Sequence, residues 1–193
     1  MRNIMILVSG MPATGKSTFA TWLSSELHTP LVCFDRITKK TLEVSKANCE
    51  DEEQRRLFAC IPYEFFLFIC EEIMKSSSML IAEYFFCDKM KDALDYLVSK
   101  YQYTTITVHM DATIETAHRR FHERGENDSS LDGIRPKVIT FENFSKGVQQ
   151  NKDFRYGDRL ILVDTENFNN VSYEEITYQI RNHMKEIKNE TYL

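Results

Sequence analysis

The residues from Gly10 to Thr18, GMPATGKST, have the types and spacing of a loop that binds the phosphates of a nucleotide. Gly10 and Gly15 allow the backbone to turn sharply and to come close to a polyphosphate, which a Cβ atom would obstruct. The turned backbone directs successive N–H groups inward, at the positive end of the helix that follows. Lys16 supplies a mobile positive charge for the β- and γ-phosphates, and the Ser17 hydroxyl is a ligand for Mg²⁺.

The surroundings of this motif argue against a glycine-containing turn that matches by accident. An apolar run over residues 4–8 precedes it and a helix-like pattern follows it, which is the strand–loop–helix context of phosphate binding. We therefore expect the loop to hold a nucleoside triphosphate through seven residues: Gly10, Ala13, Thr14, Gly15, Lys16, Ser17 and Thr18.

Apolar runs of strand length alternate with helix-period segments along the chain. Strands that alternate with helices indicate right-handed crossovers and a parallel sheet covered on both faces. No repeat, low-complexity tract or linker divides the sequence, so we expect one three-layer α/β domain over residues 1–193 with a five-stranded, mainly parallel sheet. The expected strands are residues 4–8, 30–34, 79–86, 104–110 and 160–164.

Apolar stripes at helical spacing predict four helices with recognisable ends. They are expected around residues 19–27, ended by Pro30; 93–101, capped by Asp88; 138–148, begun by Pro136; and 176–187, opened by the capping box Ser172 and Glu175.

Composition limits the setting of this domain. The formal net charge of −5 argues against a general binder of nucleic acid or of anionic membranes, although it leaves room for a local basic cleft. Five scattered cysteines without a C-x-x-C pair indicate reduced, buried thiols. No stretch is long and apolar enough to cross a bilayer. We therefore expect a cytoplasmic protein.

Two segments are not needed by the bare scaffold. A helical insert over about residues 38–75 is crowded with aromatic and apolar side chains, which either form one wall of a substrate pocket or belong to a buried helical pair broken or kinked by Pro62. The polar segment 125–133 follows an arginine-bearing helix and fits both a mobile flap and an ordinary surface loop.

Four features in order resemble the P-loop kinases, in particular the small ATP-dependent phosphotransferases that include polynucleotide, antibiotic, gluconate and adenylylsulfate kinases. The features are the loop at 10–18, the Asp that ends VCFD at 32–35, the helix HRRFHER at 118–124, and a last strand that runs into Asp164 and Thr165. They cover almost the whole chain, and only the loop is specific by itself. The resemblance implies ATP and Mg²⁺ as cofactors.

Asp35 is the candidate catalytic carboxylate. Ligands of parallel sheets gather beyond the carboxyl ends of the strands, and Asp35 ends the second expected strand. The resemblance implies that it contacts the acceptor hydroxyl, takes its proton and helps to hold the metal. The alternative is a cap of the helix that starts at Arg36, and both roles are compatible. Relatives that phosphorylate nucleic-acid ends carry an arginine three residues further on, where this chain has Thr38.

Glu83 ends the apolar run of the third expected strand, where P-loop proteins often hold Mg²⁺ through water or orient the acceptor. A partly buried glutamate in a strand is unusual without a partner. Its membership of the site stays open at this point. Together with Ser17 and Asp35 it completes the set of candidate metal ligands.

Arginines of the segment 118–124 can stabilise the charge that spreads over the transferred phosphoryl group. Arg120 and Arg124 are four residues apart, share a helix face and can both reach one phosphate chain, as parts of a lid over about residues 111–134. The alternative is a solvated face on which Glu115 pairs with Arg119. Near the last strand, Phe154 to Tyr156 occupy the place where relatives hold adenine, although a loop aromatic also packs in cores.

Two functional classes fit these residues. The first is a kinase that transfers the γ-phosphoryl group of Mg-ATP to a hydroxyl of a small molecule, a nucleoside or a polynucleotide end. The second is an ATP-binding switch or ATPase that regulates a protein partner. A switch predicts Asp-x-x-Gly after the third strand or Asn-Lys-x-Asp, and the sequence contains neither. The kinase is favoured, and the acidic charge favours a small acceptor over a nucleic-acid 5′ end. The oligomeric state is not encoded in any motif.

Overall fold

The computed structural model describes residues 3–48, 61–127, 139–157 and 159–189. Its strands form one sheet in the order β2-β3-β1-β4-β5, and every neighbouring pair is parallel. The predicted five-stranded sheet is therefore confirmed, and it is parallel throughout. The strands are β1 (Asn3–Gly10), β2 (Leu31–Cys33), β3 (Met79–Glu83), β4 (Tyr103–Asp111) and β5 (Leu160–Asp164).

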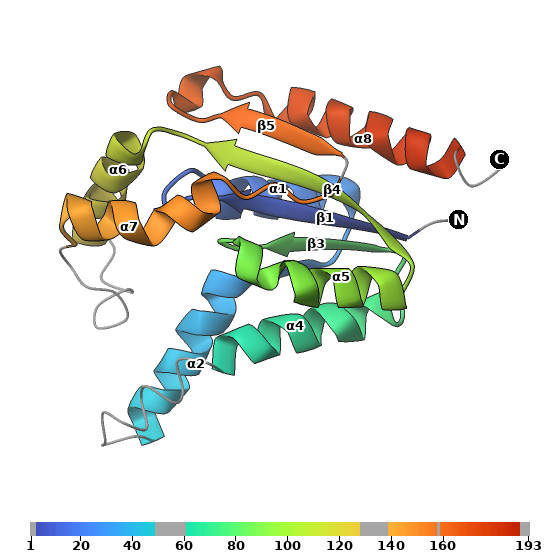
Figure 1. The fold of residues 1–193 in the computed structure, drawn as a ribbon, viewed down its shortest axis with the longest axis horizontal. Helices are drawn as coiled ribbons and strands as arrows, with labels where there is room; N and C mark the ends of the chain where they lie inside the picture. Colours follow the sequence, from blue (N-terminus) through green and yellow to red (C-terminus); the bar gives the residue numbers. More distant parts are fainter. Residues whose placement is uncertain (1–2, 49–60, 128–138, 158, 190–193) are drawn as a thin grey trace.

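Helices cover both faces of this sheet. Two further helices, α6 and α7, lie near the carboxyl ends of the strands (Figure 1). One face packs against α1 and α8, and the other against α4 and α5. The helices are α1 (Lys16–Leu27), α2 (Phe34–Asn48), α4 (Ile61–Met74), α5 (Lys91–Lys100), α6 (Ile114–Asn127), α7 (Phe141–Lys152) and α8 (Tyr173–Asn189).

The central strand β1 connects the two halves of the core. Its side chains alternate between the faces: Ile4 and Ile6 pack toward α1 and α8, whereas Met5 and Leu7 pack toward α4 and α5. A parallel strand with both faces covered is apolar along its length, which is why residues 4–8 read as one uninterrupted run. This buried strand carries the chain directly into the loop that begins at Gly10.

Four of the five strands differ in their bounds from the sequence prediction, and two of them, β2 and β3, end earlier than predicted. β2 ends at Cys33 and α2 begins at Phe34, so Asp35 lies in the first turn of the helix and neither closes the strand nor caps the helix. β3 ends at Glu83, and the Tyr84 ring outside the sheet packs at a tilt of 44° against Phe34, with ring centroids 3.9 Å apart.

Helix starts were predicted with mixed success. Ser172 accepts a hydrogen bond from the Glu175 N–H at 3.2 Å, as the predicted cap of α8 requires. Asp88 belongs instead to a short 3₁₀ turn, and Met90 stands at the cap of α5. The cap of α7 is Thr140, and Pro136 lies outside the described residues.

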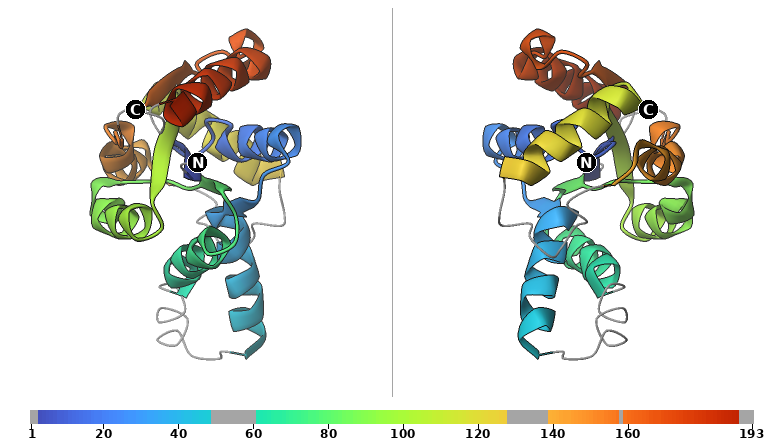
Figure 2. Two further views of the ribbon diagram at one scale, coloured as in Figure 1. Left: turned by 90° about the vertical axis from the view of Figure 1, so that its right-hand side faces the viewer. Right: turned by 90° about the vertical axis from the view of Figure 1, so that its left-hand side faces the viewer.

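The helical insert consists of α2 and α4, which lie side by side and extend from the sheet (Figure 2). The sequence predicted that Pro62 breaks or kinks the helical pair. Pro62 lies in the first turn of α4, where a missing N–H costs nothing, so it does not interrupt this helix. Phe66 is buried in the core, whereas Phe65 and Phe68 are half exposed. The connecting residues 49–60, with Leu57 and Phe58, lie outside the described part of the chain.

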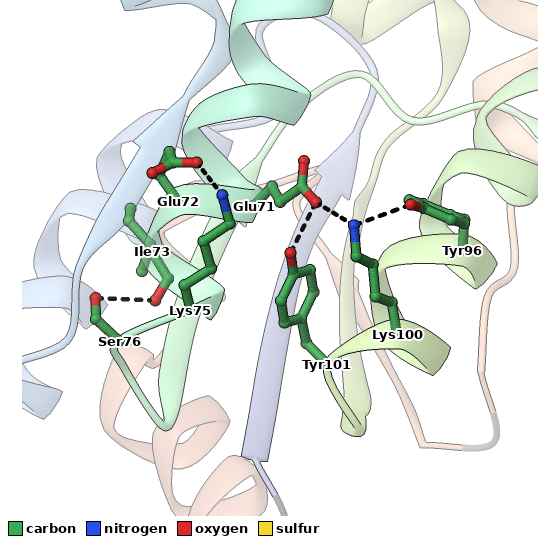
Figure 3. Close-up of polar contacts among 8 residues, drawn as sticks. All are labelled: Glu71, Glu72, Ile73, Lys75, Ser76, Tyr96, Lys100 and Tyr101. Carbon is green, nitrogen blue, oxygen red and sulfur yellow. Dashed lines mark hydrogen bonds and ion pairs between the residues drawn. The ribbon is translucent and has the colours of Figure 1, made fainter.

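A polar network fixes α4 to the scaffold through α5 (Figure 3). The Glu71 carboxylate accepts hydrogen bonds from Lys100 Nζ and the Tyr101 hydroxyl, each at 2.8 Å. Lys100 also donates to the Tyr96 hydroxyl at 2.9 Å. These hydrogen bonds lower the pKa of Glu71, so its carboxylate stays charged and holds the two helices together.

Three of the five cysteines lie within the described residues, and all three are free thiols. Cys33 and Cys70 are buried free thiols and Cys87 is half-buried, while Cys49 and Cys60 lie outside the described residues. Burial raises the pKa of the Cys70 thiol to about 12, so this thiol stays protonated. Within the described ranges, no helix is both long and apolar enough to span a membrane.

A buried imidazole on β4 has no hydrogen-bonding partner for either ring nitrogen within the described part of the chain. His109 is fully buried next to Ser9, its neighbour on β1. Burial and, to a smaller extent, the charge of Arg155 lower the pKa of His109 from 6.5 to about 4, whereas Asp111 acts in the opposite direction. The neutral ring is therefore the form that the folded protein favours.

We expect His109 to make folding stability depend on pH. The unfolded chain protonates this ring near pH 6.5 and the folded protein only near pH 4, so the free energy of unfolding falls as the pH is lowered through this window. The full difference is about 3 kcal/mol. Urea unfolding across this window measures it, with His109→Leu as the comparison. Equal pH dependence in both proteins would contradict the prediction.

Candidate active site

The loop between β1 and α1 has the backbone geometry that phosphate binding requires. Gly10, Ala13 and Gly15 have positive φ angles of 145°, 64° and 87°. A Cβ atom at Gly10 would lie 2.2 Å from the Met110 carbonyl oxygen of β4, so this position accepts only glycine. The loop is therefore held tightly against the end of the neighbouring strand.

Side chains of the loop complete this geometry. Thr14 Oγ1 and Lys16 Nζ both donate to the Met11 carbonyl oxygen at 2.8 Å, which closes the loop on itself. Gly15 stands at the cap of α1, no side chain caps the helix there, and its first turn carries no acidic residue. The N–H groups at this helix end are thus suited to an anion, because the helix dipole is positive there.

Three candidate metal ligands and Lys16 line one cavity of about 90 Å³. Ser17 comes from α1, Asp35 from α2 and Glu83 from the end of β3, which lies beside Val8 of β1. The sheet order brings them together, since β2 and β3 end next to the loop. Phe85 and Arg124 complete the walls of this cavity.

Glu83 is almost fully buried, and its environment raises the pKa of its carboxyl group above the usual value. Burial raises the pKa of its carboxyl group, while the positive charge of Lys16 and hydrogen bonds from Cys33 and Ser17 lower it. Cys33 is the residue beside it on β2, and its thiol donates to Glu83 Oε2 at 2.7 Å. Burial and the Glu83 carboxylate raise the pKa of Cys33 to about 12, so the thiol remains the donor.

The residues in this cavity fit a magnesium ion. Ser17, Asp35 and Glu83 offer oxygen atoms, which are the ligands Mg²⁺ prefers, and one or two carboxylates together with phosphates and water satisfy it. Among the described residues no group of three or more His, Cys, Asp or Glu side chains is placed to hold a metal ion by itself. The donor set therefore suits an ion that binds together with a nucleotide.

The three arginines of α6 have different surroundings. Arg124 lines both the cavity of Asp35 and a second cavity beside the loop. Arg120 lines only the second, and its guanidinium donates to the carbonyl oxygens of Thr165 and Glu166 at 2.7 and 2.8 Å. Arg119 pairs with Glu123 at 3.0 Å on the solvated face, in place of the expected Glu115. Only Arg124 therefore lines the cavity that also contains Lys16.

The second cavity, of about 790 Å³, lies beside the loop and contains residues that the sequence reasoning missed. Gly15 and Thr18 line it together with Phe168, Val171 and Tyr173, which follow β5. The Phe168 ring lies against Gly15 on one side and 4.0 Å from the Arg120 guanidinium on the other. The sequence does contain a signal for Phe168: it is an aromatic residue in a polar loop that follows the carboxyl end of a strand, where ligands of parallel sheets bind.

The residues expected at the adenine pocket lie elsewhere. Phe154 is fully buried and stacks on Phe86 and Tyr156 in the core beside α5. Tyr156 donates its hydroxyl proton to Asp95 at 2.7 Å. These aromatic side chains are core residues, which agrees with the packing interpretation of the two open alternatives.

The expected lid over residues 111–134 is described only in part. Its helix α6 ends at Asn127, and residues 128–138 lie outside the described part of the chain, including most of the segment 125–133 that was interpreted as a flap or a surface loop. The first two turns of α6 are bound to the loop after β5 through Arg120.

Several solved structures that superimpose on this chain are described as kinases. No protein-family model matches the chain. A Chloroflexus aurantiacus protein described as a kinase superimposes with a TM-score of 0.76 at 22% identity, covering 96% of this chain and 98% of that one. A gluconokinase from Sinorhizobium meliloti gives 0.55 at 13% identity over 99% and 95% of the two chains. Shikimate kinase from Aquifex aeolicus gives 0.55 at 19% over 94% and 98%. The chain thus has the α/β fold of P-loop kinases.

Proposed function

We propose that this protein is a kinase that transfers the γ-phosphoryl group of ATP, with Mg²⁺, to a hydroxyl group of a small molecule. One observation carries the proposal: the phosphate loop, two carboxylates and an arginine line one cavity. A site that only binds a triphosphate does not need a carboxylate such as Asp35 in the same cavity as Lys16. A transfer site needs a group on the acceptor side, because phosphoryl transfer depends on positioning and on charge stabilisation.

Each residue has a distinct task in this proposal. The loop N–H groups and Lys16 bind the phosphates, and Arg124 stabilises the charge on the transferred group. Asp35 orients the acceptor hydroxyl and accepts its proton late in the transfer. Ser17 and Glu83 hold Mg²⁺, with Asp35 as a further ligand, and the bound ion neutralises phosphate charge. Arg120 and Phe168 bind the nucleotide base in the larger cavity.

The proposed acceptor is a small molecule or a nucleoside. Similar solved structures named gluconokinase and shikimate kinase support this size class. A nucleic-acid 5′ end fits less well, because Thr38 stands where an arginine would grip its phosphate. The neighbouring Arg36 is held by Thr21 of α1 at 2.8 Å and does not line the cavity.

Replacing Lys16 with alanine should remove most of the ATP affinity and all measurable turnover, because the β- and γ-phosphates lose their one mobile cation in the loop. ADP release is measured while ATP is supplied with neutral polyols, hydroxy acids, nucleosides and 5′-hydroxyl oligonucleotides in turn. Unchanged ATP affinity in Lys16→Ala would contradict the loop assignment. Slow ATP hydrolysis with no acceptor dependence would favour the regulatory ATPase over the kinase.

A further inference from the structure

The start of α6 is capped by the Thr113 hydroxyl, which accepts a hydrogen bond from the Thr116 N–H at 3.2 Å, and a side chain from a distant loop binds this cap. The Glu166 carboxylate, which follows β5, accepts a hydrogen bond from the Thr113 N–H at 2.8 Å and from the Thr113 hydroxyl at 3.1 Å. It also accepts a hydrogen bond from the Thr116 hydroxyl. A carboxylate at a helix N-terminus satisfies N–H groups that have no partner within the helix and interacts favourably with the dipole. These hydrogen bonds lower the pKa of Glu166, so the group is charged.

A second set of contacts joins the same two elements one turn further along α6. Arg120 donates to the carbonyl oxygens of Thr165 and Glu166 at 2.7 and 2.8 Å. Thr165 in turn is tied to the end of β4, since its N–H and its hydroxyl both donate to the Asp111 carbonyl oxygen at 2.7 Å. The loop after β5 and the first two turns of α6 are thus joined by hydrogen bonds at two places: at the helix start to Glu166, and one turn later from Arg120.

This arrangement fixes the two groups that face each other in the larger cavity. Arg120 and Phe168 line the cavity, with the guanidinium 4.0 Å from the ring. Glu166 does not line it and lies at the opposite side of the contact, beside Thr113 and Asp164. Glu166 is therefore not placed to contact a ligand in the cavity directly, and its contacts act on the positions of Arg120 and Phe168.

We infer that Glu166 is a positioning residue for the nucleotide base: by binding the start of α6, it holds Arg120 and Phe168 in place as a preformed wall of the base cavity. This inference rests on the proposed function, because it takes the nucleotide as the ligand of that cavity. Preformed walls raise affinity because less ordering remains to be done on binding. The hydrogen bonds that close the phosphate loop lie within residues 11–16 and do not involve Glu166.

The test compares two ligands that share phosphates but differ in the base. Binding of Mg-ATP and of Mg-tripolyphosphate is measured by calorimetry for the wild type and for Glu166→Gln. We expect the variant to bind ATP about 5- to 10-fold more weakly and tripolyphosphate unchanged, because only ATP reaches the Arg120 and Phe168 wall. Glu142→Gln is the matched control, since Glu142 also lies in the first turn of a helix and pairs with Lys146 of the same helix.

Thr116→Val supplies a milder variant, since it removes one hydroxyl donor to Glu166 and keeps the side-chain shape. We expect it to weaken ATP binding in the same direction and to add nothing in the double variant with Glu166→Gln, because both changes break the same contact. Equal ATP affinity in the wild type and both variants would overturn the inference. Equal weakening of ATP and tripolyphosphate would overturn it too, by indicating general damage. A wild type that binds no ATP would instead contradict the proposed function.

Discussion

Asp35→Asn should lose phosphoryl transfer while it keeps most of its affinity for Mg-ATP. Asparagine preserves the shape of the side chain but cannot accept the proton of the acceptor hydroxyl. We expect the transfer rate to fall about 10²- to 10⁴-fold, the usual contribution of a positioned acid–base group. The loop and Lys16, which carry the phosphate contacts, are untouched. Initial rates of product formation and calorimetric ATP binding measure the two quantities separately.

Asp92→Asn is the matched control for this variant. Asp92 is an exposed aspartate that lies, like Asp35, in the first turn of a helix, but it belongs to α5, away from the cavity. The control should transfer phosphate at the wild-type rate. If Asp35→Asn also retained transfer, the role of Asp35 would be limited to its favourable interaction with the helix dipole of α2, and the catalytic assignment would be wrong.

Gly10→Ala should destabilise the protein and destroy the phosphate loop. The added Cβ would lie 2.2 Å from the Met110 carbonyl oxygen, and the φ angle of 145° is one that alanine rarely adopts. The clash is with backbone, so the two central strands β1 and β4 must move apart. We expect a loss of about 2–5 kcal/mol in the free energy of unfolding, measured by urea denaturation.

Gly147→Ala tests whether this loss comes from the site and not from the type of substitution. Gly147 lies in α7, and a Cβ atom there would meet nothing within 4 Å. Alanine should stabilise this helix by about 0.5–1 kcal/mol. A similar small effect of Gly10→Ala would contradict the description of the loop as locked against β4.

The fold was readable from the sequence wherever burial alone determines structure. β5 was predicted with its observed bounds, because its apolar run stands between polar neighbours; as an edge strand it buries Ile161 and Val163 and exposes Leu162. β2 and β3 were predicted too long at their carboxyl ends. Phe34 and Tyr84 have side chains typical of strands, but their rings pack against each other at a tilt outside the sheet. That contact joins residues fifty positions apart, and local pattern carries no information about it.

The candidate site could likewise be predicted from the sequence only in part. The loop and the two carboxylates follow from residue type and position relative to strands, and the structure places them around one cavity. The hydrogen bond from Cys33 to Glu83 depends on the pairing of β2 with β3, and the separate surroundings of Arg120 and Arg124 depend on the loop after β5. Such contacts are set by tertiary structure. Phe168 was missed for the same reason.

The central claim is that the γ-phosphoryl group of ATP reaches a hydroxyl of a small molecule in the cavity that contains Lys16 and Asp35. The most direct measurement incubates the wild-type protein with Mg-ATP carrying ¹⁸O in its γ-phosphoryl group and with a panel of hydroxyl compounds, and analyses the products by mass spectrometry. We predict a phosphorylated acceptor that retains the label, and its loss in Asp35→Asn. Label found only in inorganic phosphate, with every acceptor unmodified, would contradict the claim.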